Sequence, residues 1–321
     1  MNIGIKSAFG TTFAIAMGVL VAMGTASAQD NEPSKRWKDA LERAKLGSAV
    51  AQCELGELVV RGQEAERGMK VAAKWFKQAA DQDALCGLLR MAEFHRRGTG
   101  VKKDVGISDT YYERALPLVL ALARQGDVEM QIQLAKMHHK ALGTKEDLEL
   151  AGFWYKTAAS LLEPLVKAGD LDAAKKLGNI LVIGVGVDRD PIRAAQLYER
   201  AAEAGDRAGQ YLAGLMFFTG RAGHPVDHER GFKWLYLAAD ADHPRSQYFV
   251  GTAYADGLGI EADATRAAKW LTLAGDRGVN ASTPAMKALI EKAPRDDVEK
   301  GIDLAENWVP VFERENTTPS S

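Results

Sequence analysis

The sequence predicts an all-α solenoid of about six stacked helix-turn-helix repeats, closed at its carboxyl end by two further helices. Three observations support this fold class. A bulky residue recurs every 36 to 43 residues, several other columns of residues keep the same uneven spacing, and the alanine-rich composition contains few β-branched runs. Recurrence at this period is the signature of repeat architectures, and alanine favours closely packed helices.

Two columns of apolar residues define the helices of each unit. The second helix carries a bulky column, which consists of Trp75, Tyr111, Trp154, Leu197, Trp234 and Trp270. The first helix carries another column, which consists of Leu55, Met91, Leu134, Leu177, Leu212 and Val250. A small residue follows each member of this second column, so the first helix can approach a neighbour closely. We expect both columns to form a continuous core, because a single hairpin cannot bury its apolar faces alone.

Glycine and aspartate columns predict the turn inside each unit. The glycines are Gly100, Gly143, Gly186, Gly223 and Gly259. An aspartate follows each of them four residues later, at Asp104, Asp147, Asp190, Asp227 and Asp263. Glycine permits the positive φ that ends a helix, and an aspartate side chain can then accept the free N–H groups of the next helix. We therefore expect these aspartates to be helix caps.

Two units are longer than the others, because the bulky column is spaced 43 residues there instead of 36 or 37. Seven extra residues make about two helical turns, which keeps the buried face pointing in one direction. The additions lie around 116–122 and 160–166, are apolar, and contain Pro117 and Pro164. We expect a kinked or broken helix at these prolines. A longer piece of core and an apolar ledge for a partner or for self-association both fit the additions.

The first 28 residues are typical of a signal peptide. They contain one charged residue, Lys6, then a mostly apolar run at 11–23, and end in Ala26-Ser27-Ala28. Small residues in this pattern fit a signal-peptidase site, so we expect cleavage after Ala28 and a periplasmic or secreted protein. An uncleaved amino-terminal anchor is the alternative. No second apolar stretch has membrane length, so we expect no integral span after cleavage.

The chain has two cysteines, Cys53 and Cys86, which fall on the first helices of adjacent units. An exported protein can oxidise such a pair. Stacked helices lie about 8–10 Å apart, whereas a disulfide requires Cα atoms closer than about 7 Å. A disulfide and two small buried side chains therefore remain open alternatives.

Residues 174–202 carry the complete pattern of the unit, at Leu177-Gly178, Gly184, Gly186-Val187, Asp190, Ala194, Tyr198 and Ala201-Ala202. This pattern resembles the Sel1-like repeat, a relative of the tetratricopeptide repeat, and the resemblance covers 48–278. It implies a right-handed superhelix with the first helices on the concave side, and an adaptor that binds proteins. Some cysteine-rich secreted relatives are linked to β-lactam binding, but this chain lacks their cysteine pattern.

The flanking segments predict closure of the array. We expect an amino-terminal segment and cap at 29–47, capping helices within 279–312 and a disordered tail at 313–321. Two helices are expected near the carboxyl end, at 284–293 and 296–308. Asp296 and Glu299 fit a capping box at the start of the second of these helices. Its expected apolar face consists of Val298, Ile302, Leu304, Ala305 and Trp308.

No motif indicates catalysis or a cofactor. The net charge of −2 gives no basic footprint for nucleic acid, and no GxSxG, HExxH or CxxC motif occurs. The GxG turns follow helices, whereas phosphate-binding loops follow strands. His224, Asp227 and His228 form a weak candidate for a metal site, but Asp227 is already explained as a helix cap. We therefore expect no metal site, no cofactor and no catalytic residue.

The first helices also carry positions that packing does not use, next to the leucine column and three residues later, where they share one face. These candidate partner-binding residues are Glu54, Glu57, Arg90, Glu93, Gln133, Lys136, Lys176, Asn179, Tyr211 and Phe249. The row changes from charged to aromatic along the array. Such variation at constant packing is typical of a groove that recognises a peptide, although a merely solvated face fits as well. Tyr211 and Phe249 are the strongest anchor candidates.

These observations predict a non-catalytic periplasmic or secreted scaffold that binds a peptide or protein in a concave groove. A cell-wall or β-lactam hydrolase related to the cysteine-rich proteins is one alternative, although we can name no catalytic residues for it. A structural subunit that self-assembles through the apolar additions is another.

Overall fold

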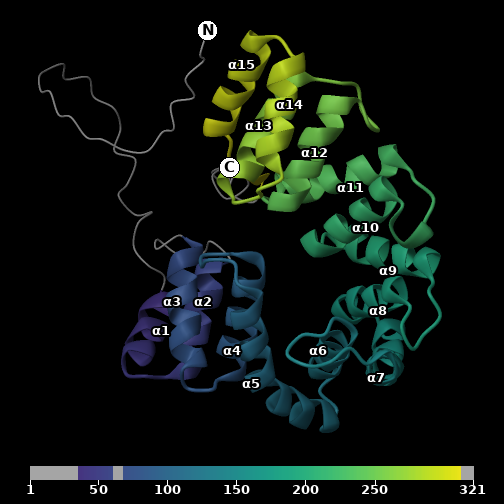
Figure 1. Cartoon of the computed structure of the whole chain (residues 1–321). Helices are drawn as coiled ribbons and strands as arrows, with labels where there is room; N and C mark the ends of the chain where they lie inside the picture. Colours follow the sequence, from purple (N-terminus) through teal and green to yellow (C-terminus); the bar gives the residue numbers. More distant parts are fainter. Residues whose placement is uncertain (1–34, 61–67, 312–321) are drawn as a thin grey trace, which may run out of the picture.

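The computed structural model describes residues 35–60 and 68–311. Within these ranges the chain forms α-helices and one short 3₁₀ helix, and contains no strand, which confirms the predicted all-α fold (Figure 1). The expected signal peptide with its cleavage site, and the expected tail at 313–321, lie outside the described residues.

The helices follow one another in pairs, flanked by one helix at the amino end and two at the carboxyl end. The first helices of the six units are α2 (Ala49–Val60), α4 (Leu85–Arg97), α6 (Val128–His139), α8 (Leu171–Ile183), α10 (Arg207–Thr219) and α12 (Pro244–Asp256). The second helices are α3 (Met69–Ala80), α5 (Val105–Arg124), α7 (Leu148–Lys167), α9 (Pro191–Glu203), α11 (His228–Asp240) and α13 (Ala264–Asp276). The flanking helices are α1 (Lys35–Lys45), α14 (Ser282–Lys292) and α15 (Arg295–Glu306).

The units stack into an open arc, in which each helix packs on the next along the chain (Figure 1). The core continues from unit to unit without a break in its first part, from Trp37 on α1 to Trp234 on α11. A second cluster begins at Phe218 and includes the capping helices. The array therefore has no single centre, and each unit depends on its neighbours to bury its apolar faces.

Aspartate caps start the second helices, as the sequence predicts. In each case the carboxylate accepts a hydrogen bond at 2.8–2.9 Å from the backbone N–H three residues later, at Asp104, Asp147, Asp190, Asp227 and Asp263. A further set starts the later first helices, with side-chain caps at Asp127, Asp170, Asp206 and His243. The histidine is the exception in this set, because it replaces a carboxylate with an imidazole.

The glycine of the turn is required for a close approach between units. Gly186 has a φ of +76°, and a Cβ at this position would overlap with the carbonyl oxygen of Gly152 at the start of α7. The equivalent Gly223 has a φ of +87° but nothing within 4 Å. Unit five differs there because its turn contains the 3₁₀ helix η1 (Arg221–Gly223).

The bulky column is partly core, and its neighbouring column is more deeply buried. Trp154, Leu197, Trp234 and Trp270 are buried, whereas Trp75 and Tyr111 are only half-buried. The residue after each of them is buried in every unit, at Phe76, Tyr112, Tyr155, Tyr198, Leu235 and Leu271. The second helix therefore directs two adjacent bulky positions toward its neighbours, and the second of these is the main core position.

The two longer units contain unbroken helices, so the expected break at the prolines is wrong. Helices α5 and α7 each run for 20 residues with Pro117 and Pro164 inside them. Packing uses one face of each addition, where Val119 and Leu162 are buried, while Leu161 and Leu165 stay about 40% and 44% exposed. Burial of one face fits helices held by packing on both sides. Among the described residues, no helix is long and apolar enough to cross a membrane.

The carboxyl-terminal helices form near the expected positions, but the expected capping box is wrong. Helix α15 starts at Arg295 with Pro294 before it, so Asp296 lies inside the first turn and makes no cap hydrogen bond. Glu299 instead accepts a hydrogen bond from Arg295 at 2.7 Å. Val298 and Ala305 are buried as expected, whereas Leu304 is 45% exposed.

Candidate protein-binding groove

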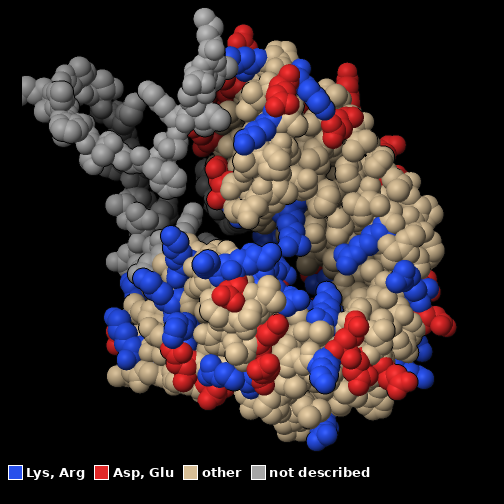
Figure 2. All heavy atoms as spheres, viewed as in Figure 1, with Lys and Arg blue, Asp and Glu red and all other residues tan. Residues whose placement is uncertain are grey.

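The first helices of the units lie along the inner side of the arc, and Lys and Arg side chains gather around its hollow (Figures 1 and 2). Ion pairs connect these helices directly. Arg90 of α4 donates to Glu57 of α2 at 2.6 Å, and Lys176 of α8 pairs with Glu129 of α6 at 2.8 Å. All ten residues of the predicted row lie on α2, α4, α6, α8, α10 and α12. We call this wall the inner groove.

At the amino end of the groove the predicted charges neutralise one another. Arg36 and Arg43 of α1 donate to the two oxygens of Glu54 at 2.8 and 2.9 Å. The hydrogen bond from Arg36 holds the pKa of Glu54 below its usual range, with Arg43 adding to the effect against the opposing cost of burial. Glu57 is occupied by Arg90. These side chains hold α1, α2 and α4 together, so they are already engaged within the protein.

The middle of the groove contains one carboxylate with two partners. Glu93 accepts a hydrogen bond from the hydroxyl of Tyr112 at 3.1 Å and forms an ion pair with Arg97. Burial, together with the Glu93 charge, raises the pKa of Tyr112 well above its usual value, so the phenol stays protonated and donates. Lys136 lies close enough for Glu93 to affect its pKa, but it forms no ion pair with any residue in 35–60 or 68–311.

Farther along, polar residues support the packing. Lys176 pairs with Asp172 as well as Glu129, each at 2.8 Å, and these hydrogen bonds outweigh burial and raise its pKa. Asn179 accepts a hydrogen bond from the Tyr198 hydroxyl at 3.0 Å. Gln133, on α6, is half-buried.

The carboxyl end of the groove is aromatic. The ring of Tyr211 lies 4.3 Å from that of His243, measured between centroids. Phe249 packs on Phe218 at 6.0 Å and on Tyr248 at 5.3 Å. Tyr211 and Phe249 are half-buried, so each keeps part of its ring accessible. An aromatic side chain held in this way loses little conformational entropy when a ligand covers it.

Contacts within the protein therefore separate the predicted row into residues that already have partners and residues that keep free groups. Ion pairs within the chain occupy the charged row residues of units one, two and four, and a hydrogen bond occupies Asn179. Lys136 and the aromatic pair remain as the groups with unused binding capacity. The sequence analysis did not separate Lys136 from Lys176. Asp172, four residues before Lys176, was a usable local signal. The second partner, Glu129, lies 47 residues before Lys176 and meets it only because the units stack.

The two cysteines are bonded to each other. The disulfide joins Cys53 of α2 to Cys86 of α4, with the Cα atoms 6.2 Å apart. This distance is shorter than the usual spacing of packed helices and lies within the range that a disulfide allows. The disulfide closes the amino end of the array.

The histidine candidates have packing roles. Asp227 caps α11, while His224 packs edge-on against Phe217 at 5.0 Å and His228 packs against Phe218 at the same distance. Across the described parts of the chain, no three His, Cys, Asp or Glu side chains come together in a group that could hold a metal ion.

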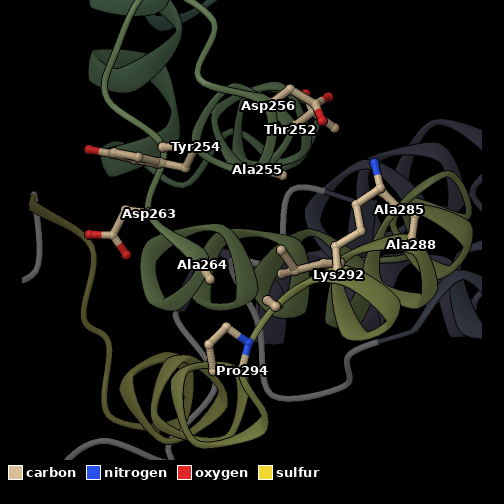
Figure 3. A pocket seen from close by; sticks show the side chains of 13 residues that line it. Thr252, Tyr254, Ala255, Asp256, Asp263, Ala264, Ala285, Ala288, Lys292 and Pro294 are labelled. Atoms are coloured by element: carbon tan, nitrogen blue, oxygen red, sulfur yellow. The ribbon is translucent and has the colours of Figure 1, made fainter.

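A cleft that the sequence did not predict lies beside the last unit (Figure 3). It has a volume of about 360 Å³ and is lined mainly by alanines and by Leu289 and Pro294. Its polar groups are Thr252, Tyr254 and Asp256 on α12, Asp263 at the start of α13 and Lys292 on α14. The signal for it was weak, because it depends on the angle at which the capping helix α14 leaves the array.

Comparison with known proteins gives one family. The model of the Sel1 repeat matches six segments of the chain, at 49–83, 87–116, 128–161, 171–206, 207–243 and 244–279. Each segment falls on one of the six helix pairs described above, and two of them end within the long helices α5 and α7.

Among solved structures, a Sel1 repeat protein from Oxalobacter formigenes is 24% identical, with a TM-score of 0.41 over 75% of this chain and 97% of that one. A Sel1 repeat protein from Klebsiella pneumoniae is 19% identical, with a TM-score of 0.37 over 68% and 99%. A curated relative is the ERAD-associated E3 ubiquitin-protein ligase component HRD3A of Arabidopsis thaliana, 37% identical over 64 residues. That match covers 20% of this chain and only 9% of the relative.

Proposed function

The chain belongs to the Sel1 repeat family, whose members are generally protein-interaction scaffolds, and we propose that it holds a peptide or protein segment in its inner groove without catalysing a reaction. We also propose that it works in the periplasm or outside the cell. The groove assignment depends on one observation. The residues that recur in every unit serve packing and helix capping, whereas some residues of the first helices keep accessible groups.

The recurring residues are committed to the architecture. The aspartates of the turns cap helices, the glycines permit close approach, and the bulky columns pack between helices. The residues that differ from unit to unit lie on the first helices, where Lys136, Tyr211 and Phe249 have capacity for another molecule. Partly exposed aromatic side chains on one concave wall are typical of surfaces that bind proteins.

The location rests on the amino-terminal sequence. Ala26-Ser27-Ala28 after an apolar run fits export, and a disulfide such as Cys53–Cys86 persists in oxidising compartments. Cell fractionation followed by mass measurement of the intact protein tests this part. A mature chain beginning at Gln29 in the periplasm or medium is expected, and a full-length chain in the cytoplasm would contradict it.

The groove is tested by crosslinking in cells followed by mass spectrometry. The double variant Tyr211→Ala plus Phe249→Ala should lose the partner that the unmodified protein captures, because it removes both aromatic anchors. The matched control is Phe153→Ala plus Leu161→Ala, which removes two exposed apolar side chains from α7, a second helix. Equal capture by the unmodified protein and the groove variant, with both folded by circular dichroism, would reject the groove.

The non-catalytic assignment has a separate test. Purified protein is expected to leave both peptidoglycan fragments and a chromogenic β-lactam unchanged. Turnover of either, at a rate proportional to protein concentration, would favour the hydrolase instead.

A further inference from the structure

Lys136 is the cation of the inner groove whose charge the described residues leave unbalanced. Its side chain is half-buried on α6 and forms neither an ion pair nor a hydrogen bond with any of them. Three other cations act on it, namely Arg96, Arg97 and Lys140, against one carboxylate, Glu93. That carboxylate is already shared between Arg97 and the Tyr112 hydroxyl.

Arg96 has its own acidic partner, because Asp109 of α5 lies 3.6 Å from it. Among the described residues, Lys136 and Lys140 form no ion pair. Burial is the main cause that lowers the pKa of Lys136, and the neighbouring cations lower it further. An ammonium group in such a place is costly unless an opposite charge approaches it.

Lys176 on α8 shows the opposite situation in the same wall. It is also half-buried, but Glu129 and Asp172 both reach it at 2.8 Å and raise its pKa. Among the described residues, two carboxylates therefore pair with Lys176 and none pairs with Lys136. A carboxylate of another molecule would balance the charge of Lys136.

The site described next lies in the inner groove and depends on that groove being the binding surface. We propose that the wall formed by α4 and α6 is the recognition site for an acidic peptide segment, in which a glutamate or aspartate of the bound partner pairs with Lys136 while Lys140 and Arg96 attract the neighbouring acidic residues. The aromatic pair Tyr211 and Phe249 then contacts apolar residues of the same segment farther along the groove.

The spacing of charges favours a peptide over a nucleic acid. Acidic side chains interrupt the basic ones along the wall, at Glu93, Glu129 and Asp172. A nucleic acid presents a continuous row of phosphates, and these carboxylates would repel part of it. A peptide can place one or two carboxylates beside Lys136 and neutral residues elsewhere. Lys and Arg around the hollow of the arc provide the long-range attraction (Figure 2).

The site is tested by fluorescence anisotropy with the full-length mature protein and a labelled hexaglutamate peptide. Saturable binding is expected, with no binding of a labelled hexaglutamine peptide of the same length. Lys136→Met removes the charge and keeps an apolar stem, and should weaken hexaglutamate binding by roughly tenfold or more, the usual effect of losing one charge-assisted contact. The matched control is Lys156→Met, which removes the same charge from the exposed side of α7 and should leave the affinity unchanged.

Three outcomes of the anisotropy measurement would overturn the site. They are equal binding of hexaglutamine, equal weakening by both lysine variants, and tighter binding of a labelled oligothymidylate that Lys136→Met also reduces. Because Lys136 has no ion-pair or hydrogen-bond partner among the described residues, Lys136→Met should melt at the same temperature as the unmodified protein or higher, which keeps misfolding from imitating the result. If crosslinking captures a partner that Tyr211→Ala plus Phe249→Ala loses and Lys136→Met retains, the groove stands and the acidic site fails.

Discussion

The ring of Tyr211 lies 4.3 Å from the ring of His243, and this histidine caps helix α12 in the position where the three preceding units have aspartate. The Nδ1 of His243 accepts a hydrogen bond from the backbone N–H of Ser246 at 3.2 Å. Only the neutral imidazole has a free lone pair for this role. The contact between Tyr211 and His243 thus joins a candidate anchor of the inner groove to a side chain that can take up a proton.

The first prediction is a loss of stability in mild acid that depends on His243. Burial, with Arg207 and Arg245 nearby, lowers the pKa of His243 to about 4 from 6.5. The unfolded chain therefore takes up a proton that the folded chain refuses, so this contribution is complete above pH 6.5 and disappears as the pH falls toward 4. The full effect is about 3 kcal/mol.

Urea unfolding at pH 7 and pH 4.5 measures this effect. His243→Asn keeps a capping oxygen without a titrating group, and should lose less stability between the two pH values than the unmodified protein. His224→Asn is the control, because His224 caps no α-helix, and it should retain the full loss. Identical losses in all three proteins would show that His243 does not titrate in this range.

The second prediction concerns a helix cap. Asp147→Ala removes the acceptor for the N–H of Leu150 at 2.8 Å, and should lower the free energy of unfolding by about 1 kcal/mol. Asp147→Asn retains an acceptor and should cost much less. Chemical denaturation of both variants checks this, and an equal cost would mean that the negative charge matters more than the hydrogen bond.

The third prediction compares two glycines with similar backbone angles. Gly186→Ala combines a positive φ with an overlap at Gly152, and should cost roughly 3 kcal/mol or more. Gly223→Ala has the positive φ without a neighbour and should cost only about 1–2 kcal/mol. Thermal unfolding of the two variants, monitored by circular dichroism, should rank them in this order. The reverse order would contradict the close approach between units three and four.

The fourth prediction concerns the disulfide. Cys53 and Cys86 close a loop with a sequence separation of 33, so opening the bond should lower stability by about 3–4 kcal/mol. Reductant should lower the unfolding midpoint of the unmodified protein and leave that of Cys53→Ala plus Cys86→Ala unchanged. Alkylation before reduction should add no mass, whereas uptake of two alkyl groups would show that the cysteines are free.

The turns and helix starts were predictable because the glycine and aspartate columns each reflect a local requirement of the backbone. A glycine at Gly186 and an aspartate at Asp190 specify a turn and a helix start within a few residues, and both are local features. The expected breaks at Pro117 and Pro164 were wrong, because α5 and α7 continue through the prolines and pack on the helices of neighbouring units. The expected capping box at Asp296 was wrong because α15 begins one residue earlier, at Arg295, directly after Pro294.

The candidate site was less predictable, because it depends on which charges the fold brings together. Tyr211 and Phe249 were found from their positions on the first helices. The contrast between Lys136 and Lys176 was missed. Asp172, four residues before Lys176, indicated part of it, but Glu129 reaches Lys176 only after units three and four stack. The role of His243 was also missed, although its place in the column of Asp127, Asp170 and Asp206 was a usable signal.

The local origin of the caps has a consequence for how such arrays change in length. Asp206 and Asp227 start the two helices of unit five from within that unit or its immediate border, so excising residues 206–242 would leave α12 with His243 as its own starting residue. Insertion or deletion of a whole module thus keeps the caps of the remaining helices, provided that the new neighbours pack on one another. Gain or loss of a whole unit can therefore lengthen or shorten the inner groove, and with it the length of the segment that it can bind, without changes to the remaining turns.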